Sequence, residues 1–226
     1  MNSPESTQLA GDGFAEALIS GIHRVIDDQE LLNQINVFPV PDGDTGTNLS
    51  LSLGAVLPVL QQAEEKHLGT LLAAVADAVL DGARGNSGAI MAQFFQGMSD
   101  SAGDLSRFTP YTFAKAVTMG SDYAHDAMSK PREGTILSVI AAFATSIADG
   151  AKHGADGSFA AVIGSALEQA KQALAETQEQ LEVLRKAGVV DAGAKGFVDL
   201  VDGMDEYLRT GIWETAPEPD TAKQSA

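Results

Sequence analysis

The chain has 226 residues, of which 44% are hydrophobic, and it carries a formal net charge of −17 with no cysteine. The acidic excess argues against binding to nucleic-acid backbones or anionic membrane surfaces, and the missing cysteines exclude disulfides and thiolate metal sites. There is no run of about 18 apolar residues and no basic segment followed by an apolar one, so we expect a cytoplasmic protein without a membrane span or signal peptide.

Apolar residues recur at helical spacing along most of the chain, which favours an all-α fold. Phe14, Leu18 and Ile22, for example, fall on one face of the first predicted helix. Pro58 predicts a kink in the second helix, and only the stretch INVFPV at 35–40 looks extended. Eight helices are predicted, over residues 13–33, 47–63, 68–82, from 86 onward, 109–128, 133–149, 157–187 and 191–209. Their short connections indicate an up-and-down bundle or a helical barrel.

The two ends of the chain lack this periodicity. Residues 1–12 and 214–226 are polar and rich in Pro, Ser and Ala, a composition typical of flexible segments. We therefore expect one ordered domain over about residues 13–213, between a flexible N-terminus and a flexible C-terminal tail.

Four glycine-bearing segments lie at or just before the starts of predicted helices. They are PDGDTGTN at 41–48, GARGNSGA at 82–89, KPREGT at 130–135 and VVDAGAKG at 189–196. If successive helices alternate in direction, the helices that follow these segments all begin at the same end of the molecule. Helix N-termini expose unpaired N–H groups and the positive end of the helix dipole, so this end is expected to favour anions, phosphate above all.

Two carboxylates stand in the first of these segments. Asp42 and Asp44 are separated by one glycine and follow the proline-stiffened run VFPVP. Carboxylates alone would compete with phosphate, but a carboxylate pair that holds Mg²⁺ lets the metal bind the phosphates. Thr45, Thr47 and Asn48 add hydroxyl and amide groups at the helix start. The alternative is that the Asp-Gly-Asp turn serves only as a helix N-cap.

Other known binding motifs do not fit the sequence. The twelfth position counted from Asp42 is Leu53, where an EF-hand loop needs a bidentate Glu. No Gly-Lys-Ser/Thr sequence is present, which excludes a Walker A loop. The segment GARGNSG lacks the Gly-x-Gly start and the preceding strand of a dinucleotide fingerprint.

The sequence resembles a known family through four motifs that occur in order. These are NVFPVPDGDTGTN, GARGNSGAIMAQFFQG, REGT and VVDAGAKGF. They closely resemble the nucleotide-binding (DhaL-type) domain shared by the L subunit of dihydroxyacetone kinase and the A subunit of bacterial fatty acid kinase. The fatty acid kinase is nearer, because its N-terminal domain carries the NVFPVPDGDTGTN form. The resemblance covers about residues 13–213 and implies an eight-helix antiparallel barrel that binds ATP or ADP with two Mg²⁺ ions at one end.

The resemblance also implies roles for residues of the first motif. Asp42 and Asp44 correspond to Mg²⁺ ligands. Asn36 stands nearest to the position of a third aspartate in dihydroxyacetone kinase, so one metal is expected to bind more weakly or to take more water. Thr47 and Asn48 are expected to face the phosphates.

Two later motifs supply further candidates by the same resemblance. Ser87 and Gly88 are similar to a loop that wraps phosphate with backbone N–H groups. Asp191 and Gly193 are similar to the segment that closes over the nucleoside. These four residues, with Thr47 and Asn48, form the expected nucleotide-binding set.

No residue stands out as a general base or a covalent nucleophile. Arg132 and Arg185 are candidates for neutralising charge on a transferred phosphoryl group, although such an Arg is more often a solvated surface residue. A fatty acid carboxylate is already ionised at neutral pH and needs no base. The hydroxyl of dihydroxyacetone needs one, which we expect from a partner subunit.

The leading hypothesis is therefore an ATP·Mg²⁺-binding phosphoryl-transfer subunit of fatty-acid-kinase type. It is expected to work with a separate fatty-acid-binding (DegV-type) carrier protein. The alternatives are a dihydroxyacetone kinase L-type subunit, which works with a dihydroxyacetone-binding subunit, and a regulatory protein that binds ADP without catalysis. A homodimer is compatible with each of these hypotheses.

Overall fold

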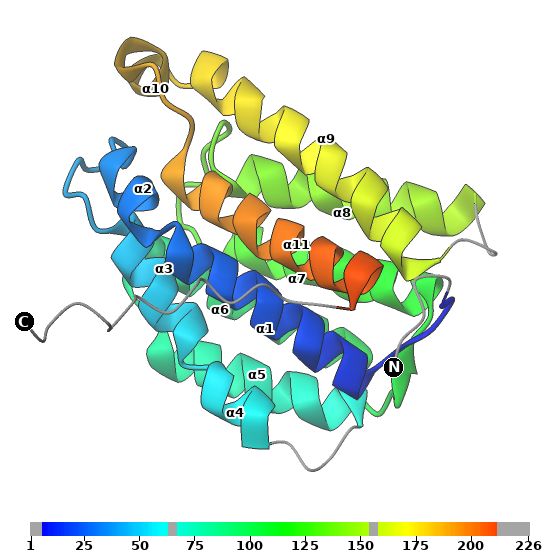
Figure 1. Cartoon of the computed structure of the whole chain (residues 1–226). Helices are drawn as coiled ribbons and strands as arrows, with labels where there is room; N and C mark the ends of the chain where they lie inside the picture. Colours follow the sequence, from blue (N-terminus) through cyan, green and yellow to red (C-terminus); the bar gives the residue numbers. More distant parts are fainter. Residues whose placement is uncertain (1–5, 63–66, 154–157, 212–226) are drawn as a thin grey trace, which may run out of the picture.

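A computed structural model of the chain describes residues 6–62, 67–153 and 158–211 (Figure 1). The described residues form eleven helices and two strands of two residues each, which confirms the all-α prediction. The elements are β1 (Leu9–Ala10), α1 (Gly11–Asp27), α2 (Gln29–Gln34), α3 (Thr45–Gly54), α4 (Leu57–Gln62), α5 (Leu68–Gly82), α6 (Gly85–Ala102), β2 (Arg107–Phe108), α7 (Pro110–Asp126), α8 (Ile136–His153), α9 (Phe159–Gln180), α10 (Glu182–Ala187) and α11 (Ala192–Thr210).

The long helices close into a ring. Contacts run from α1 to α11, then to α9, α8, α7, α6 and α5, and from α5 back to α1 both directly and through α3. Figure 1 shows these helices with roughly aligned axes. Residues 63–66 and 154–157, where two of the predicted connections fall, lie outside the described part of the chain, as do most residues of the two predicted flexible ends.

Three of the eight predicted helices are each broken in two, so the count of eight is not confirmed. The breaks fall between α1 and α2, between α3 and α4, and between α9 and α10. The proline at position 58 explains the second break, because its ring clashes with the carbonyl four residues earlier. That carbonyl belongs to Gly54, where α3 ends, so the predicted kink is a full interruption. At the third break, the backbone of Leu181 is extended.

The expectation of an extended segment at 35–40 is wrong. Residues 36–44 form an irregular loop whose Phe38–Pro39 peptide bond is cis. Proline has no N–H for a strand ladder, and the Val40 carbonyl accepts a hydrogen bond from the Asn36 side chain instead. The two strands lie elsewhere: β1 pairs antiparallel with β2, with Leu9 opposite Phe108. β1 and the start of α1 fall within the N-terminus that was expected to be flexible.

Edge-to-face aromatic contacts hold the end of the barrel at which α1, α7 and α9 begin. Phe14 contacts Phe108 with ring centroids 6.1 Å apart, Phe108 contacts Phe113 at 5.3 Å, and Phe113 contacts Phe159 at 5.6 Å. Such pairs stabilise a core beyond the burial of their area. The helices that alternate with these three begin at the opposite end, which is therefore the end where the candidate site lies.

None of the helices in the described part of the chain is both long enough and apolar enough to span a bilayer.

Candidate functional site

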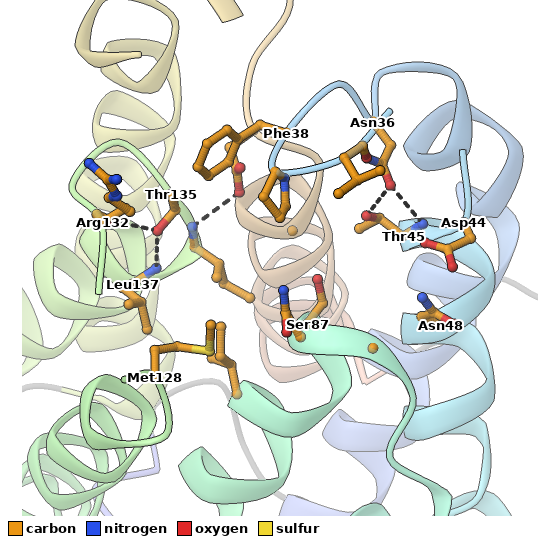
Figure 2. Close-up of a pocket in the computed structure, with 18 of the residues that line it drawn as sticks. Asn36, Phe38, Asp44, Thr45, Asn48, Ser87, Met128, Arg132, Thr135 and Leu137 are labelled. Carbon is orange, nitrogen blue, oxygen red and sulfur yellow. Dashed lines mark hydrogen bonds between the residues drawn. The ribbon is translucent and has the colours of Figure 1, made fainter. Parts of the chain in front are cut away.

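A cavity of about 490 Å³ opens at the end of the barrel where α3, α6, α8 and α11 begin (Figure 2). All four glycine-bearing segments contribute to its wall, as the alternation of helix directions predicted. The residues lining it are Asn36, Phe38, Pro39, Val40, Asp42, Asp44, Thr45, Asn48, Gly85, Asn86, Ser87, Ile90, Met128, Lys130, Pro131, Arg132, Thr135, Ile136, Leu137, Asp191 and Gly193.

Most of the predicted site residues share this wall. Those present are Asn36, Asp42, Asp44, Asn48, Ser87, Asp191 and Gly193. Thr47 and Gly88 are not part of the lining. The Thr47 hydroxyl accepts a hydrogen bond from the Asn33 side chain, and Gly88 is buried against Ser52, whose Oγ would lie 2.4 Å from an added Cβ. The roles of all these residues toward a nucleotide stay predictions.

The two carboxylates of the first motif are exposed at the mouth of the cavity. Neither Asp42 nor Asp44 hydrogen-bonds or ion-pairs through its side chain with another residue of the described ranges. Asp44 occupies the N-cap position of α3, but its side chain makes no capping hydrogen bond. The N-cap alternative is therefore not what the structure shows, and both carboxylates remain available to a ligand.

An asparagine caps α3 in place of Asp44. Asn36, which is only 5% exposed, accepts hydrogen bonds through Oδ1 from the Thr45 amide at 3.0 Å and from the Thr45 hydroxyl (Figure 2). Its Nδ2 donates to the Val40 carbonyl at 2.9 Å. Three residues before Asn36, the side-chain oxygen of Asn33 accepts a hydrogen bond of 3.0 Å from the Thr47 amide. Sequence reasoning missed Asn33 altogether, since nothing in the motif pointed to it.

A buried aspartate takes up the first amides of α8 and α11. Oδ1 of Asp191 accepts hydrogen bonds from Ala194 N at 2.9 Å and from Ile136 N at 3.1 Å. The Asp191 amide donates to Thr177 Oγ1, so this residue joins α8, α9 and α11. Burial raises the pKa of the Asp191 carboxyl to about 6, and the backbone hydrogen bonds only partly oppose that shift.

The expected cluster of unpaired N–H groups is therefore smaller than predicted. At α3, α8 and α11, side chains accept most of the first amides. At α6 no described acceptor takes the amides of Gly85, Asn86 and Ser87, and the N-cap residue Arg84 gives no side-chain cap. The positive end of α6 is thus the part of the wall best suited to bind an anion.

Gly85 shapes the turn at the start of α6. Its φ is +61°, and an added Cβ would lie 2.6 Å from Nδ2 of Asn48. A glycine is required here both by the left-handed backbone and by this close approach. The turn thereby brings the free backbone amides of α6 beside the side-chain amide of Asn48. Asn48 itself lies one helical turn after Asp44.

Two cations line the cavity on the segment before α8. Lys130 and Arg132 form no ion pair with any residue in the described ranges. Arg185, the other predicted candidate, lies on α10 and outside the lining. The structure therefore separates the two arginines that the sequence could not rank.

The acid pair suits Mg²⁺ held largely by water and phosphate. The described residues contain no group of three or more His, Asp or Glu side chains placed to hold a metal, in keeping with Asn at position 36. Mg²⁺ commonly binds through one or two carboxylates together with waters and substrate phosphates. Asp42 and Asp44, exposed and unpaired across from free amides, fit that kind of site.

Comparison with known proteins identifies the family. The DAK2 domain model matches residues 39–206. Protein YloV of Bacillus subtilis is 36% identical over 210 residues, which cover 93% of this chain and 37% of YloV. A protein of Staphylococcus saprophyticus is 35% identical over 221 residues, which cover 97% of this chain and 39% of that protein. The chain thus spans less than two fifths of the length of these relatives.

Solved structures show the same fold. Dihydroxyacetone kinase from C. freundii, in complex with AMP-PNP and Mg²⁺, gives a TM-score of 0.64 at 18% identity, covering 87% of this chain and 33% of that one. Its native form gives 0.63 at 17% identity, covering 89% and 36%. The resemblance drawn from the four motifs is confirmed: the family model matches well over half of the sequence, and the chain belongs to the DAK2 domain family.

Proposed function

We propose that this chain is the ATP·Mg²⁺-binding, phosphoryl-transferring part of a kinase of fatty-acid-kinase type. The observation that carries the proposal is the pairing of two free carboxylates with free amides across one cavity. Asp42 and Asp44 are unpaired at its mouth, and the first amides of α6 are free at its floor. The NVFPVPDGDTGTN form of the first motif, which resembles that of the fatty acid kinase A subunit, supports the fatty-acid-kinase type.

In this proposal the residues divide the work of binding a nucleotide. Asp42 and Asp44 hold Mg²⁺, which when bound neutralises charge on the phosphates and orients them. The amides of Gly85, Asn86 and Ser87 donate hydrogen bonds to the phosphate oxygens, as the free amides of a helix N-terminus do. The Asn48 amide, beside Gly85, is placed to hydrogen-bond the same oxygens.

The chemistry of the wall favours an acceptor that is already ionised. No histidine lines the cavity in the described part of the chain. Oδ1 of Asp191 is engaged by backbone amides, which leaves Oδ2 as the one oxygen of this carboxyl open to a proton. Transfer to a carboxylate needs positioning and charge neutralisation rather than a base. We therefore propose a fatty acid, presented by a separate carrier protein, as the acceptor.

The test is ATP consumption with defined acceptors at saturating Mg²⁺. The chain is mixed with an acyl-loaded fatty-acid-binding protein, with a dihydroxyacetone-binding subunit plus dihydroxyacetone, or with no acceptor. Turnover only with the acyl-loaded protein is the expected result. Turnover only with dihydroxyacetone would assign the chain to the other kinase. ADP binding with no turnover in any of these mixtures would instead indicate a regulatory nucleotide-binding protein.

A further inference from the structure

The short helix α2 lies against the start of α3, beside the loop that carries the two carboxylates (Figure 1). The sequence predicts that this segment continues the first helix, but the helix is interrupted at Asp28 and α2 begins at Gln29. Two asparagines, Asn33 on α2 and Asn36 just after it, reach across to α3. The polar atoms of both side chains are used in hydrogen bonds within the protein. We therefore look for their function in the segments that these bonds connect.

Asn36 uses both ends of its amide inside the loop. Its oxygen accepts from the Thr45 amide and hydroxyl, and its nitrogen donates to the Val40 carbonyl. A carbonyl oxygen has two lone pairs, so two donors leave it no good site for a metal. The residue closes the loop from Asn36 to Thr45 around Asp42 and Asp44, and thereby sets where these carboxylates stand.

Asn33 makes a matching contact within the first turn of α3. Its oxygen accepts from Thr47 N at 3.0 Å, and its nitrogen donates to Thr47 Oγ1 at 3.1 Å. The backbones approach closely between these contacts, because an added Cβ at Gly46 would lie 2.1 Å from the Gln29 carbonyl. The first turn of α3 is therefore fixed to α2 by two side chains and by direct backbone packing.

The other end of α2 is anchored to the side of the cavity formed by the start of α11. Lys195, in the first turn of α11, forms an ion pair of 2.9 Å with Asp28, which precedes α2. Asp191 and Gly193 of the cavity wall lie just before Lys195 in the chain. Contacts thus run from the start of α11 through α2 to the loop of the two carboxylates.

We propose that Asn33 and Asn36 are positioning residues for the metal and nucleotide site, and that α2 is the element through which they act. The inference rests on the proposed Mg²⁺–nucleotide function. It assigns Asn36 to holding the loop and not to the metal. Losing either asparagine frees amides of α3 and lets the two carboxylates move apart, which costs metal affinity more than it costs nucleotide affinity without metal.

The experiment measures ADP affinity by calorimetry, in EDTA and over a series of Mg²⁺ concentrations, well below the melting temperature. The readout is the Mg²⁺ concentration that gives half of the gain in affinity. We expect Asn36→Ala to raise it about tenfold and Asn33→Ala about threefold, as for a lost hydrogen bond within a folded protein. ADP affinity in EDTA should stay within about twofold of wild type. Gln34→Ala, an exposed amide on the same helix, is the matched control and should change neither value.

Asn36→Asp separates a loop-holding role from a ligand role. If Asn36 were a metal ligand, a carboxylate there would lower the Mg²⁺ midpoint. In the proposal it raises the midpoint as alanine does, because an oxygen then faces the Val40 carbonyl. A lowered midpoint for Asn36→Asp would overturn the inference, and so would unchanged midpoints in both alanine variants. If Asn36→Ala does not fold, by circular dichroism, the half-buried Asn33→Ala decides alone.

Failure of the proposed function gives a different pattern. Wild-type protein whose ADP affinity does not respond to Mg²⁺ would contradict the metal–nucleotide site itself. Wild-type protein that responds, with variants that respond identically, would contradict only the role of the asparagines.

Discussion

The two sides of the cavity are built from helix starts that look alike in sequence but are used differently. On the α8 and α11 side, the buried carboxyl of Asp191 accepts the amides of both helices. On the α3 and α6 side, asparagines accept the amides of α3 while those of α6 remain free, and two exposed carboxylates face them. On the first side the helix amides are bonded within the protein, whereas on the second side the amides of α6 and the two carboxylates are free to bind a ligand.

This difference teaches that a helix N-terminus is an anion site only where the fold leaves its amides free. Every helix has unpaired amides in its first turn, so the backbone alone does not distinguish α6 from α8. The distinction comes from side chains distant in sequence, as when Asp191 reaches the amide of Ile136. The predictions below test whether the two sides differ in function as they do in structure.

The largest effect is expected from removing the exposed carboxylates. Asp42→Ala combined with Asp44→Ala should abolish the gain in ADP affinity that Mg²⁺ brings, because the metal then has no protein ligand. Stability should change by no more than about 0.5 kcal/mol, as is usual for exposed residues without partners. Calorimetric titration with ADP and Mg²⁺, together with urea unfolding, checks both statements. A double variant that kept its response to Mg²⁺ would place the metal elsewhere.

The α8 and α11 side of the cavity, where Asp191 accepts the helix amides, should instead control the stability of the fold, and this effect should depend on pH. Burial raises the pKa of Asp191 from its ordinary 3.8 to about 6, so the folded state holds this proton more tightly than the unfolded state does. Its stabilising contribution is complete below about pH 4 and is lost as the pH rises through about 6. Asp191→Asn keeps an oxygen acceptor for the amides and removes the ionisation.

The free energy of unfolding of wild type relative to Asp191→Asn should therefore fall between pH 4 and pH 6 and level off above that. The full change is expected to be about 3 kcal/mol, because each unit of pKa shift corresponds to about 1.4 kcal/mol. Urea unfolding of both proteins at pH 4, 5, 6 and 7.5 measures it. Parallel curves for the two proteins would contradict the role given to this carboxyl.

Glycines at the two ends of α6 allow the effect of backbone strain at the cavity to be compared with its effect away from the cavity. Gly85→Ala forces a left-handed residue and a Cβ close to Asn48, and should weaken ADP affinity about tenfold. Gly103, at the other end of α6, has φ +47° and no atom within 4 Å of an added Cβ. Gly103→Ala should lower the melting temperature without changing ADP affinity. Equal losses of affinity in the two variants would show that strain alone was responsible.

The smallest effect is expected from Arg132, one of the two cations that line the cavity. Arg132→Gln should lower ADP affinity about threefold, and less at high salt, because an exposed charge acts on phosphate mainly through a screened field. Arg185→Gln is the control, since Arg185 lies outside the lining. Titrations at low and high salt distinguish the two arginines. An equal response from both would mean that Arg132 is no more than a surface charge.

Local patterns predicted much of this structure. Spacing of apolar residues such as Phe14, Leu18 and Ile22 gave the helical fold, and Pro58 marked the interruption after α3. The glycine segments placed four helix starts at one end, and the motif containing Asp42 and Asp44 pointed to the cavity found there. The prediction of an extended segment at 35–40 was wrong because the Asn36 side chain hydrogen-bonds the Val40 carbonyl and holds the segment as a loop. No local rule predicts this contact.

The sequence by itself determined which segments are helical, the interruption at Pro58, and that two carboxylates and several glycines would meet at one end. These properties follow from spacing, proline chemistry and alternation of direction, all of which act over a few residues. Only the tertiary structure decided which amides stay free for a ligand. That choice depends on side chains such as Asn33 and Asp191 reaching helices other than their own, and such contacts exist only once the barrel has closed.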